Sequence, residues 1–169
     1  MRTSDSTGYY IDIYRSDNEV SNDYIYHNIG DTLVFSDYDG NPLQMETVTY
    51  PLMGDDYPGF RFFSNVERKE DVNQDVKGTF HVKNRAGEET FMHLFLPASG
   101  KTYYRAKSPA VKTAGRQYAH QPLPLFTMRS EKEAWSQPFI AIFEPSKNKA
   151  GGTITSVERI PELCNDQTR

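Results

Sequence analysis

The sequence predicts an all-β fold, an antiparallel β-sandwich of about ten strands. Apolar residues recur at every second position through most of the chain, which is the period of a half-buried strand. Aromatic residues make up 13% of the chain, with 11 Tyr and 10 Phe, and aromatic side chains suit a pleated surface. Turn-forming clusters of Gly, Pro, Asn and Asp separate these runs at the spacing typical of a sandwich.

The length of 169 residues fits one domain. We predict a single sandwich over residues 1–163 and a tail over 164–169. A domain of this size buries roughly 70% of its unfolded surface, so it folds without a disulfide or a structural metal. Cys164 is the only cysteine, and one thiol supports neither an internal disulfide nor a cysteine-based zinc site.

The first third of the chain predicts short alternating strands. In the run over 9–14, Ile11 and Ile13 share one face, while Tyr10, Asp12 and Tyr14 share the other. Strands follow over 23–27 and 32–35, and the run 39–42 (Asp-Gly-Asn-Pro) is a strong turn signal.

The middle of the chain predicts two more strands and a hairpin. We expect strands over 45–50 and 60–66, a loop over 54–59, and an exposed charged segment over 68–73. Strands over 76–83 and 89–96 form a hairpin around 84–87. The second of these carries Met92, Leu94 and Leu96 on one face and Phe91, His93 and Phe95 on the other, so it is expected to be central and covered on both sides.

The last third predicts strands over 101–107, 125–129, 138–143 and 153–160. The run 138–143 is apolar on both faces, hence central. Residues 108–124 are irregular and polar, and a loop of this length is expected to serve function or packing.

Charge and motifs exclude several classes of function. The net charge of −4, with no basic run, argues against nucleic-acid binding, although a local Arg/Lys cluster could still serve a polyanion. No apolar run is long enough to span a membrane. The sequence has no phosphate loop, dinucleotide fingerprint, nucleophile elbow or His-Glu-x-x-His motif.

Tyr26 and His27 are the most unusual neighbours. A His and a Tyr together can exchange the protons that β-elimination from a uronate requires. Adjacent strand residues point to opposite faces, however, so these two side chains converge only if the strand ends between them. For His27 three roles remain open: a hydrogen-bonded cap of the strand end, a metal ligand, or a catalytic group.

For the other histidines and the arginines, the sequence suggests less specific roles. We expect His81 to face solvent, His93 to be a hydrogen-bonded core residue, and His120 to lie in the polar loop within reach of a ligand. A guanidinium group can bind the carboxylate or sulfate of a sugar, or it can be ion-paired within the protein. The arginines considered for this role are Arg15, Arg105, Arg116 and Arg129.

Three stretches together resemble the heparinase II/III-like polysaccharide lyases. The first is Tyr10 to Arg15 followed by Asn22 to Asn28, which resembles that family's "Asp-hydrophobic-aromatic-Arg … Asp-Tyr-x-x-His" stretch. The others are Pro124 to Arg129 with Phe139 to Pro145, and Ile154 to Ile160, which resemble the end of the same β domain.

The resemblance implies the later part of a large antiparallel sandwich that follows an α/α toroid. Such lyases cleave uronate-containing polysaccharides, such as the glycosaminoglycan heparin, or alginate, by β-elimination. It also implies that the catalytic Tyr and one key His belong to the toroid. Some members bind zinc in the sandwich through two His and an Asp, and His27 resembles the last of those ligands, the others lying upstream of Met1.

We therefore expect a C-terminal sandwich domain that supports a substrate cleft and is catalytically incomplete alone. Its expected partners are an acidic polysaccharide and an upstream toroid, with no cofactor of its own and zinc possible only in a full-length parent. Residues expected nearest the cleft are Arg15, Tyr26, His27 and Arg129. Periplasmic or secreted location is implied by the resemblance alone. The alternative is a free-standing carbohydrate-binding module, in which rings such as Tyr103, Tyr104 and Tyr118 form an exposed platform; burial of these rings favours a scaffold.

Overall fold

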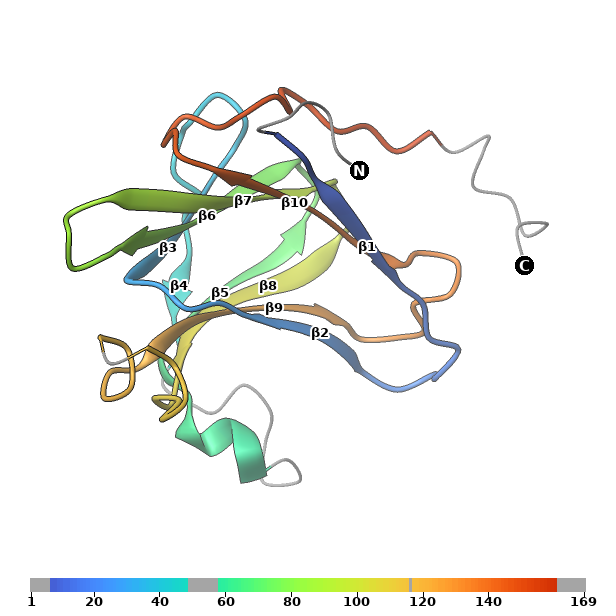
Figure 1. The fold of residues 1–169 in the computed structure, drawn as a ribbon. Helices are drawn as coiled ribbons and strands as arrows, with labels where there is room; N and C mark the ends of the chain where they lie inside the picture. Colours follow the sequence, from blue (N-terminus) through green and yellow to red (C-terminus); the bar gives the residue numbers. More distant parts are fainter. Residues whose placement is uncertain (1–6, 49–57, 116, 161–169) are drawn as a thin grey trace.

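The computed structural model describes residues 7–48, 58–115 and 117–160. They form two antiparallel five-stranded sheets, which face each other as a β-sandwich (Figure 1). This confirms the predicted fold class. The strands are β1 (Tyr10–Tyr14), β2 (Asn22–His27), β3 (Thr32–Ser36), β4 (Glu46–Thr47), β5 (Ser64–Val72), β6 (Val76–Lys83), β7 (Glu89–Leu96), β8 (Lys101–Ser108), β9 (Leu123–Ser130) and β10 (Phe139–Ser146).

The two sheets divide the chain in an interleaved order. The first sheet runs β1-β10-β7-β6-β3, and the second runs β2-β9-β8-β5-β4. β1 and β2 follow each other in sequence but belong to opposite sheets, and each is an edge strand. One side of the sandwich is therefore bounded by β1 above and β2 below, as Figure 1 shows.

The core lies between the sheets and is rich in aromatic rings. Phe80, Phe126, Phe139, Phe143 and Tyr103 are fully buried there. Phe126 packs edge-on against Tyr103, with ring centroids 5.5 Å apart. Edge-to-face contacts of this kind stabilise a core beyond the area that they bury.

The central position predicted for β7 is confirmed. Leu94 and Leu96 point into the core, while His93 and Phe95 on the opposite face are also buried. The segment after β10 covers this outer face, because Asn148 accepts a hydrogen bond from His93 Nε2 and Ala150 accepts one from Lys77 Nζ.

The strand predicted over 60–66 is wrong in its first half, where the aromatic pattern was misleading, while residues 64–66 do belong to β5. Residues 60–66 were expected as a strand, but Pro58–Phe62 form a 3₁₀ helix (η1). A 3₁₀ helix places residues three apart on one side, so Phe60 and Phe63 pack edge-on with centroids 5.2 Å apart. The charged segment over 68–73 is mostly exposed, as predicted, and it continues β5, which runs to the buried Val72.

The predicted last strand is also wrong. Residues 153–160 pair with no strand, and Thr153 and Ile154 donate their amides to the carboxylate of Glu144 instead. Backbone donors that would have formed a ladder are thus satisfied by one buried side chain.

Some predictions fall outside the described residues: the tail 164–169, Cys164, Arg116, and the end of the expected strand over 45–50. The described residues contain no helix long and apolar enough to cross a bilayer.

Candidate functional site

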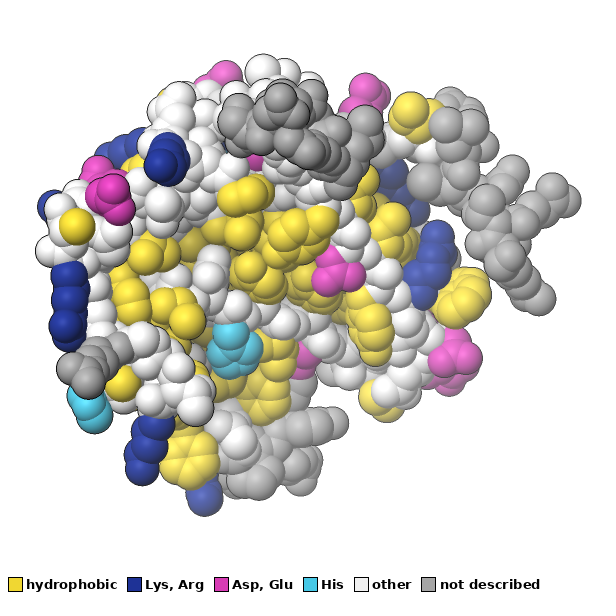
Figure 2. All heavy atoms as spheres, viewed as in Figure 1, with side chains coloured by type: hydrophobic (Ala, Val, Ile, Leu, Met, Phe, Trp, Pro, Cys, Tyr) yellow, Lys and Arg dark blue, Asp and Glu magenta, His cyan; other side chains and the backbone are white. Residues whose placement is uncertain are grey.

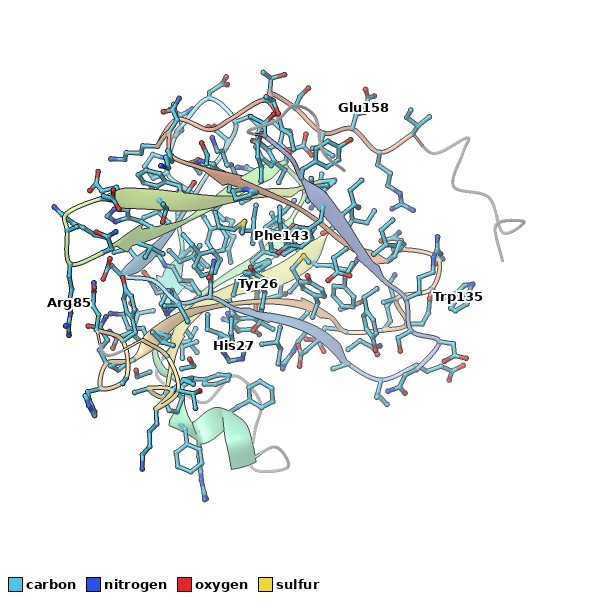
Figure 3. The ribbon with its side chains drawn as sticks, viewed as in Figure 1. Tyr26, His27, Arg85, Trp135, Phe143 and Glu158 are labelled. Carbon is cyan, nitrogen blue, oxygen red and sulfur yellow. The ribbon has the colours of Figure 1, made fainter. Side chains whose placement is uncertain are left out.

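Tyr26 lies on the open side of the sandwich, between β1 and β2. Its ring packs on that of Phe143, with centroids 4.5 Å apart, and Figure 3 shows these two side chains facing each other. The Tyr26 hydroxyl lies 3.3 Å from that of Tyr10. Next to this pair, Tyr24 donates a 2.8 Å hydrogen bond to Asp12 Oδ2. The two edge strands are therefore joined by tyrosine hydroxyls and one carboxylate.

Two of these tyrosines, Tyr10 and Tyr24, are poor proton acceptors. Burial, together with the hydrogen bond to Asp12, raises the pKa of Tyr24 well above its usual range. Burial and the neighbouring Tyr26 likewise raise the pKa of Tyr10. A tyrosine that abstracts a proton near neutral pH needs the opposite shift, with a cation stabilising the phenolate. These two groups are suited to packing and hydrogen bonding rather than to base catalysis.

His27 projects from the opposite face of β2, as the strand alternation predicts. The residue is exposed overall, but its ring meets Phe63 edge-on at a centroid distance of 6.2 Å, and partial desolvation of the ring lowers its pKa. Figure 3 shows His27 below β2, away from Tyr26. The imidazole is therefore mostly neutral at neutral pH and able to bind a metal. Within the described ranges, however, no three His, Cys, Asp or Glu side chains come together as a metal site, so His27 finds no co-ligands there.

Arg129 is engaged in an ion pair within the protein. It faces Asp23 across the β2–β9 ladder and binds it through two hydrogen bonds of 2.9 and 3.1 Å. The side chains are only 11% and 7% exposed, and the guanidinium lies over the ring of Tyr104. The ion-pair reading of this arginine is thus the one that the structure supports.

Arg15 lies at the far end of β1. Its guanidinium sits 5.8 Å from the ring centroid of Trp135 and donates a hydrogen bond to the carbonyl of Trp135. Trp135 is 43% exposed and projects from the edge of the molecule (Figure 3). The four predicted cleft residues therefore do not converge: Tyr26 lies between the sheets, His27 and Arg129 lie on the outer face of the second sheet at opposite ends, and Arg15 lies at the tip beside Trp135.

The remaining predictions have mixed outcomes. His93 is a core histidine, as expected, with Nδ1 3.1 Å from Thr79 Oγ1. His81 is only partly exposed, since it stacks on Phe91 and lies 3.2 Å from Glu89. Arg105 is ion-paired with Glu67 at 2.6 Å. His120 lies exposed in the loop before β9.

The proposed aromatic platform is absent from these three positions. Tyr103, Tyr104 and Tyr118 are 0%, 7% and 6% exposed. Buried rings cannot stack on a sugar, so their burial favours a scaffold over a binding module built on these residues.

Exposed apolar side chains gather instead on the edge strand β1. Ile11 and Ile13 are 55% and 57% exposed on one face of β1, and Tyr10 and Tyr14 are 43% and 45% exposed on the other. Figure 2 shows a broad hydrophobic area on the side of the molecule where β1 and β2 face the viewer. Contiguous exposed apolar residues are typical of surfaces that contact another protein part.

Sequence reasoning missed a groove of about 600 Å³ along the free side of β3. The loop 36–43 forms one wall, and Lys77 with residues 149–150 forms the other. The lining includes Val34, Asp37, Tyr38, Asp39, Leu43, Lys77, Arg105 and Lys149. No sequence motif predicts this groove, because its charged residues come from four separate regions of the chain. The only sequence features that point to it are the turn at 39–42 and the lysines after β10.

Comparison with known proteins shows a relative among the polysaccharide lyases. Over 165 residues, 93% of this chain is 37% identical to a stretch of an endo-acting ulvan lyase of Formosa agariphila. The chain spans about a fifth of the length of that curated relative. No family model matches the sequence, and no solved structure matches it significantly. This β-sandwich is therefore related in sequence to one part of a larger lyase.

Proposed function

We propose that this chain is the sandwich part of a heparinase II/III-like polysaccharide lyase that cleaves a uronate-containing polysaccharide by β-elimination. In this proposal the sandwich supports the substrate cleft and holds no complete catalytic centre. The observation that carries it is the 37% identity, over nearly the whole chain, to a fifth of an endo-acting ulvan lyase.

The chemistry of the described residues is consistent with a sandwich that supports the cleft and does not itself catalyse the reaction. β-Elimination needs a base for the proton next to the uronate carboxyl group and an acid for the leaving oxygen. Tyr26 and His27 face opposite sides of β2, and the pKa values of Tyr10 and Tyr24 are raised. These groups do not combine into an acid–base pair.

The exposed face of β1 supports a contact with another part of the parent protein. Ile11 and Ile13 are 55% and 57% exposed on an edge strand. We propose that the upstream α/α toroid packs there. Arg15 and His27, which are both exposed, remain the cleft candidates best placed to reach a substrate, and zinc at His27 would require ligands from the parent. A secreted or periplasmic location belongs to the same proposal.

The test combines binding and turnover. The purified chain is titrated calorimetrically with ulvan, heparin, hyaluronan, alginate and a neutral glucan, and each mixture is assayed for the ultraviolet absorbance of a new C4–C5 double bond. We expect binding of at least one uronate polymer and no double-bond formation. Turnover by this chain alone would contradict the supporting role, and binding confined to the neutral glucan would favour a free-standing binding module.

A further inference from the structure

We propose that the groove along β3 is a binding subsite for one acidic sugar unit, with its carboxylate or sulfate held by Lys77 and Lys149. This rests on the proposed function and adds to it a specific place and chemistry of binding. The groove is bounded by the loop 36–43 and the segment after β10, which lie side by side at one end of the first sheet (Figure 1).

The groove has the size and mixed lining of a sugar site. Its volume of about 600 Å³ falls within the range of roughly 300–1,000 Å³ that is typical of small-ligand sites. Val34 is 51% exposed and, with Pro42 and Leu43, supplies an aliphatic surface for the face of a pyranose ring. Polar groups on the two walls then determine the orientation of the ring.

Two lysines place positive charge on one wall. Lys77 Nζ donates a 2.5 Å hydrogen bond to the carbonyl of Ala150 and lies 5.6 Å from the ring centroid of Phe95. This contact orients the ammonium group at the wall of the groove. Lys149 is exposed on the same wall, so two ammonium groups can converge on one anionic substituent.

Acceptors on the opposite wall suit the sugar hydroxyls. The Asp37 carboxylate accepts hydrogen bonds of 2.8 Å from both the amide and the side chain of Asn41. Gly40, with a φ of +90°, permits the tight turn that follows. Asp37 is thereby held in place, and Asp39 lies exposed beside it on the groove lining. Carboxylates that accept from hydroxyls are common orienting groups in polar sites.

The third cation of the groove does not add free charge. Arg105 is ion-paired with Glu67 at 2.6 Å, and its Nη1 donates to the carbonyl of Leu33 at 3.2 Å. Arg105 therefore closes one end of the groove and caps the backbone edge of β3. The charge that remains for a ligand is the lysine pair on one wall, opposite the two aspartates on the other.

Both walls are preorganised. The segment after β10 is anchored because the buried carboxylate of Glu144 accepts hydrogen bonds from residues 152–154, and His93 Nε2 bonds to Asn148. The opposite loop is closed by the hydrogen bond from Leu43 to Phe35, which measures 3.0 Å. Walls that are fixed before binding lose little conformational entropy when a ligand enters.

The experiment uses the full chain and defined probes: an alginate tetrasaccharide, a heparin-derived tetrasaccharide and neutral cellotetraose. Affinity is measured by calorimetry, and backbone amide shifts are followed by NMR. The variants are Lys149→Gln and Asp39→Asn, with Lys147→Gln as the matched control, since Lys147 is an exposed lysine of the same segment outside the groove lining.

We expect an acidic probe to bind and to shift amides in 36–43 and 147–151. Loss of one charge-assisted contact in Lys149→Gln should weaken binding about tenfold, whereas Lys147→Gln should change it less than about twofold. Equal binding of cellotetraose, or no binding of either acidic probe, would overturn the subsite.

Acidic binding that Lys149→Gln and Asp39→Asn leave unchanged would also overturn the subsite. That result would leave the proposed function standing, because it would place the polysaccharide elsewhere on the sandwich. Double-bond formation by the chain alone would contradict the proposed supporting role, but it would not contradict binding in the groove.

Discussion

Glu144 and Thr153 are joined by two hydrogen bonds, because the carboxylate Oε1 accepts from the backbone amide at 2.6 Å and from the hydroxyl at 2.7 Å. Glu144 is only 1% exposed, and its second oxygen faces the amides of Gly152 and Ile154. One side chain of β10 thereby anchors residues 152–154 of the segment that follows.

Substitution Glu144→Gln should destabilise the fold. It removes the charge and replaces one acceptor oxygen by an amino group facing backbone donors, so we expect a loss of roughly 1–3 kcal/mol in the free energy of unfolding. Urea denaturation measures this loss. The control is Glu158→Gln, at an exposed position of the same segment. Its free energy of unfolding should stay within about 0.5 kcal/mol of that of the unsubstituted chain. Equal stability of the two variants would show that the hydrogen bonds of Glu144 do not contribute to the free energy of unfolding.

The same carboxylate should make stability depend on pH in the acid range. Burial alone would raise the pKa of Glu144, but the hydrogen bonds from Thr153, Ile154 and Gly152 outweigh it and lower the pKa below its ordinary value of 4.5. Because the folded-state pKa is depressed, the contribution is complete above the unfolded pKa and is lost as pH falls through the folded pKa.

The measurement is the free energy of unfolding of the unsubstituted chain and of the Glu144→Gln variant, as the pH is lowered from neutral to below 4. The difference between them should shrink as the acid range is entered. A difference that stays constant through this range would mean that Glu144 titrates alike in the folded and unfolded states.

Breaking the Arg129–Asp23 pair should cost stability rather than only ligand affinity. Both side chains are nearly buried, so Asp23→Asn leaves an uncompensated guanidinium, with an expected loss of roughly 3–5 kcal/mol. The control is the exposed pair of Arg68 with Glu46, where Glu46→Gln should cost less than about 1 kcal/mol. Thermal and urea unfolding give both values. Comparable small losses at the two sites would refute a structural role for Arg129.

Gly78→Ala should overpack the core between β3 and β7. An added Cβ would lie 2.9 Å from Phe35 Cε1 and 3.4 Å from Leu94 Cβ, both in the core. The expected loss is about 1–3 kcal/mol, since neither neighbour can move without disturbing the packing. Gly115→Ala, where a Cβ would meet nothing within 4 Å, provides the control. Equal unfolding midpoints for the two variants would show that Phe35 and Leu94 can move to accommodate the added methyl group.

The regular hairpins of this fold could be predicted because their alternation is unbroken. β6 and β7 have the predicted bounds, and the two covered faces of β7 follow from its continuous apolar run. β5 was divided wrongly because its pairing with β8 has two register shifts, and Asn65 and Asp71 adopt positive φ. Irregularities of this kind interrupt the period on which a strand prediction depends.

The candidate site could be predicted only in part. The opposite orientation of Tyr26 and His27 follows from strand alternation, and the structure confirms it. That Arg129 is paired with Asp23 could not be inferred, because the partners are 106 residues apart and meet through the register of β2 with β9. The lysine pair of the groove has the same origin, since Lys77 lies on β6 and Lys149 in the turn after β10, and both line the groove only because the segment after β10 folds back.

By itself, the sequence determined the fold class, the central strands and the face of each alternating side chain, because these depend on periods of two along a single strand. Only the tertiary structure decided which edges meet, which charges are paired and where a groove forms. Those features depend on strand order, and β1 and β2 are adjacent in sequence yet lie at the edges of different sheets. Contacts between distant segments are set by packing and register, which no local pattern of residues encodes.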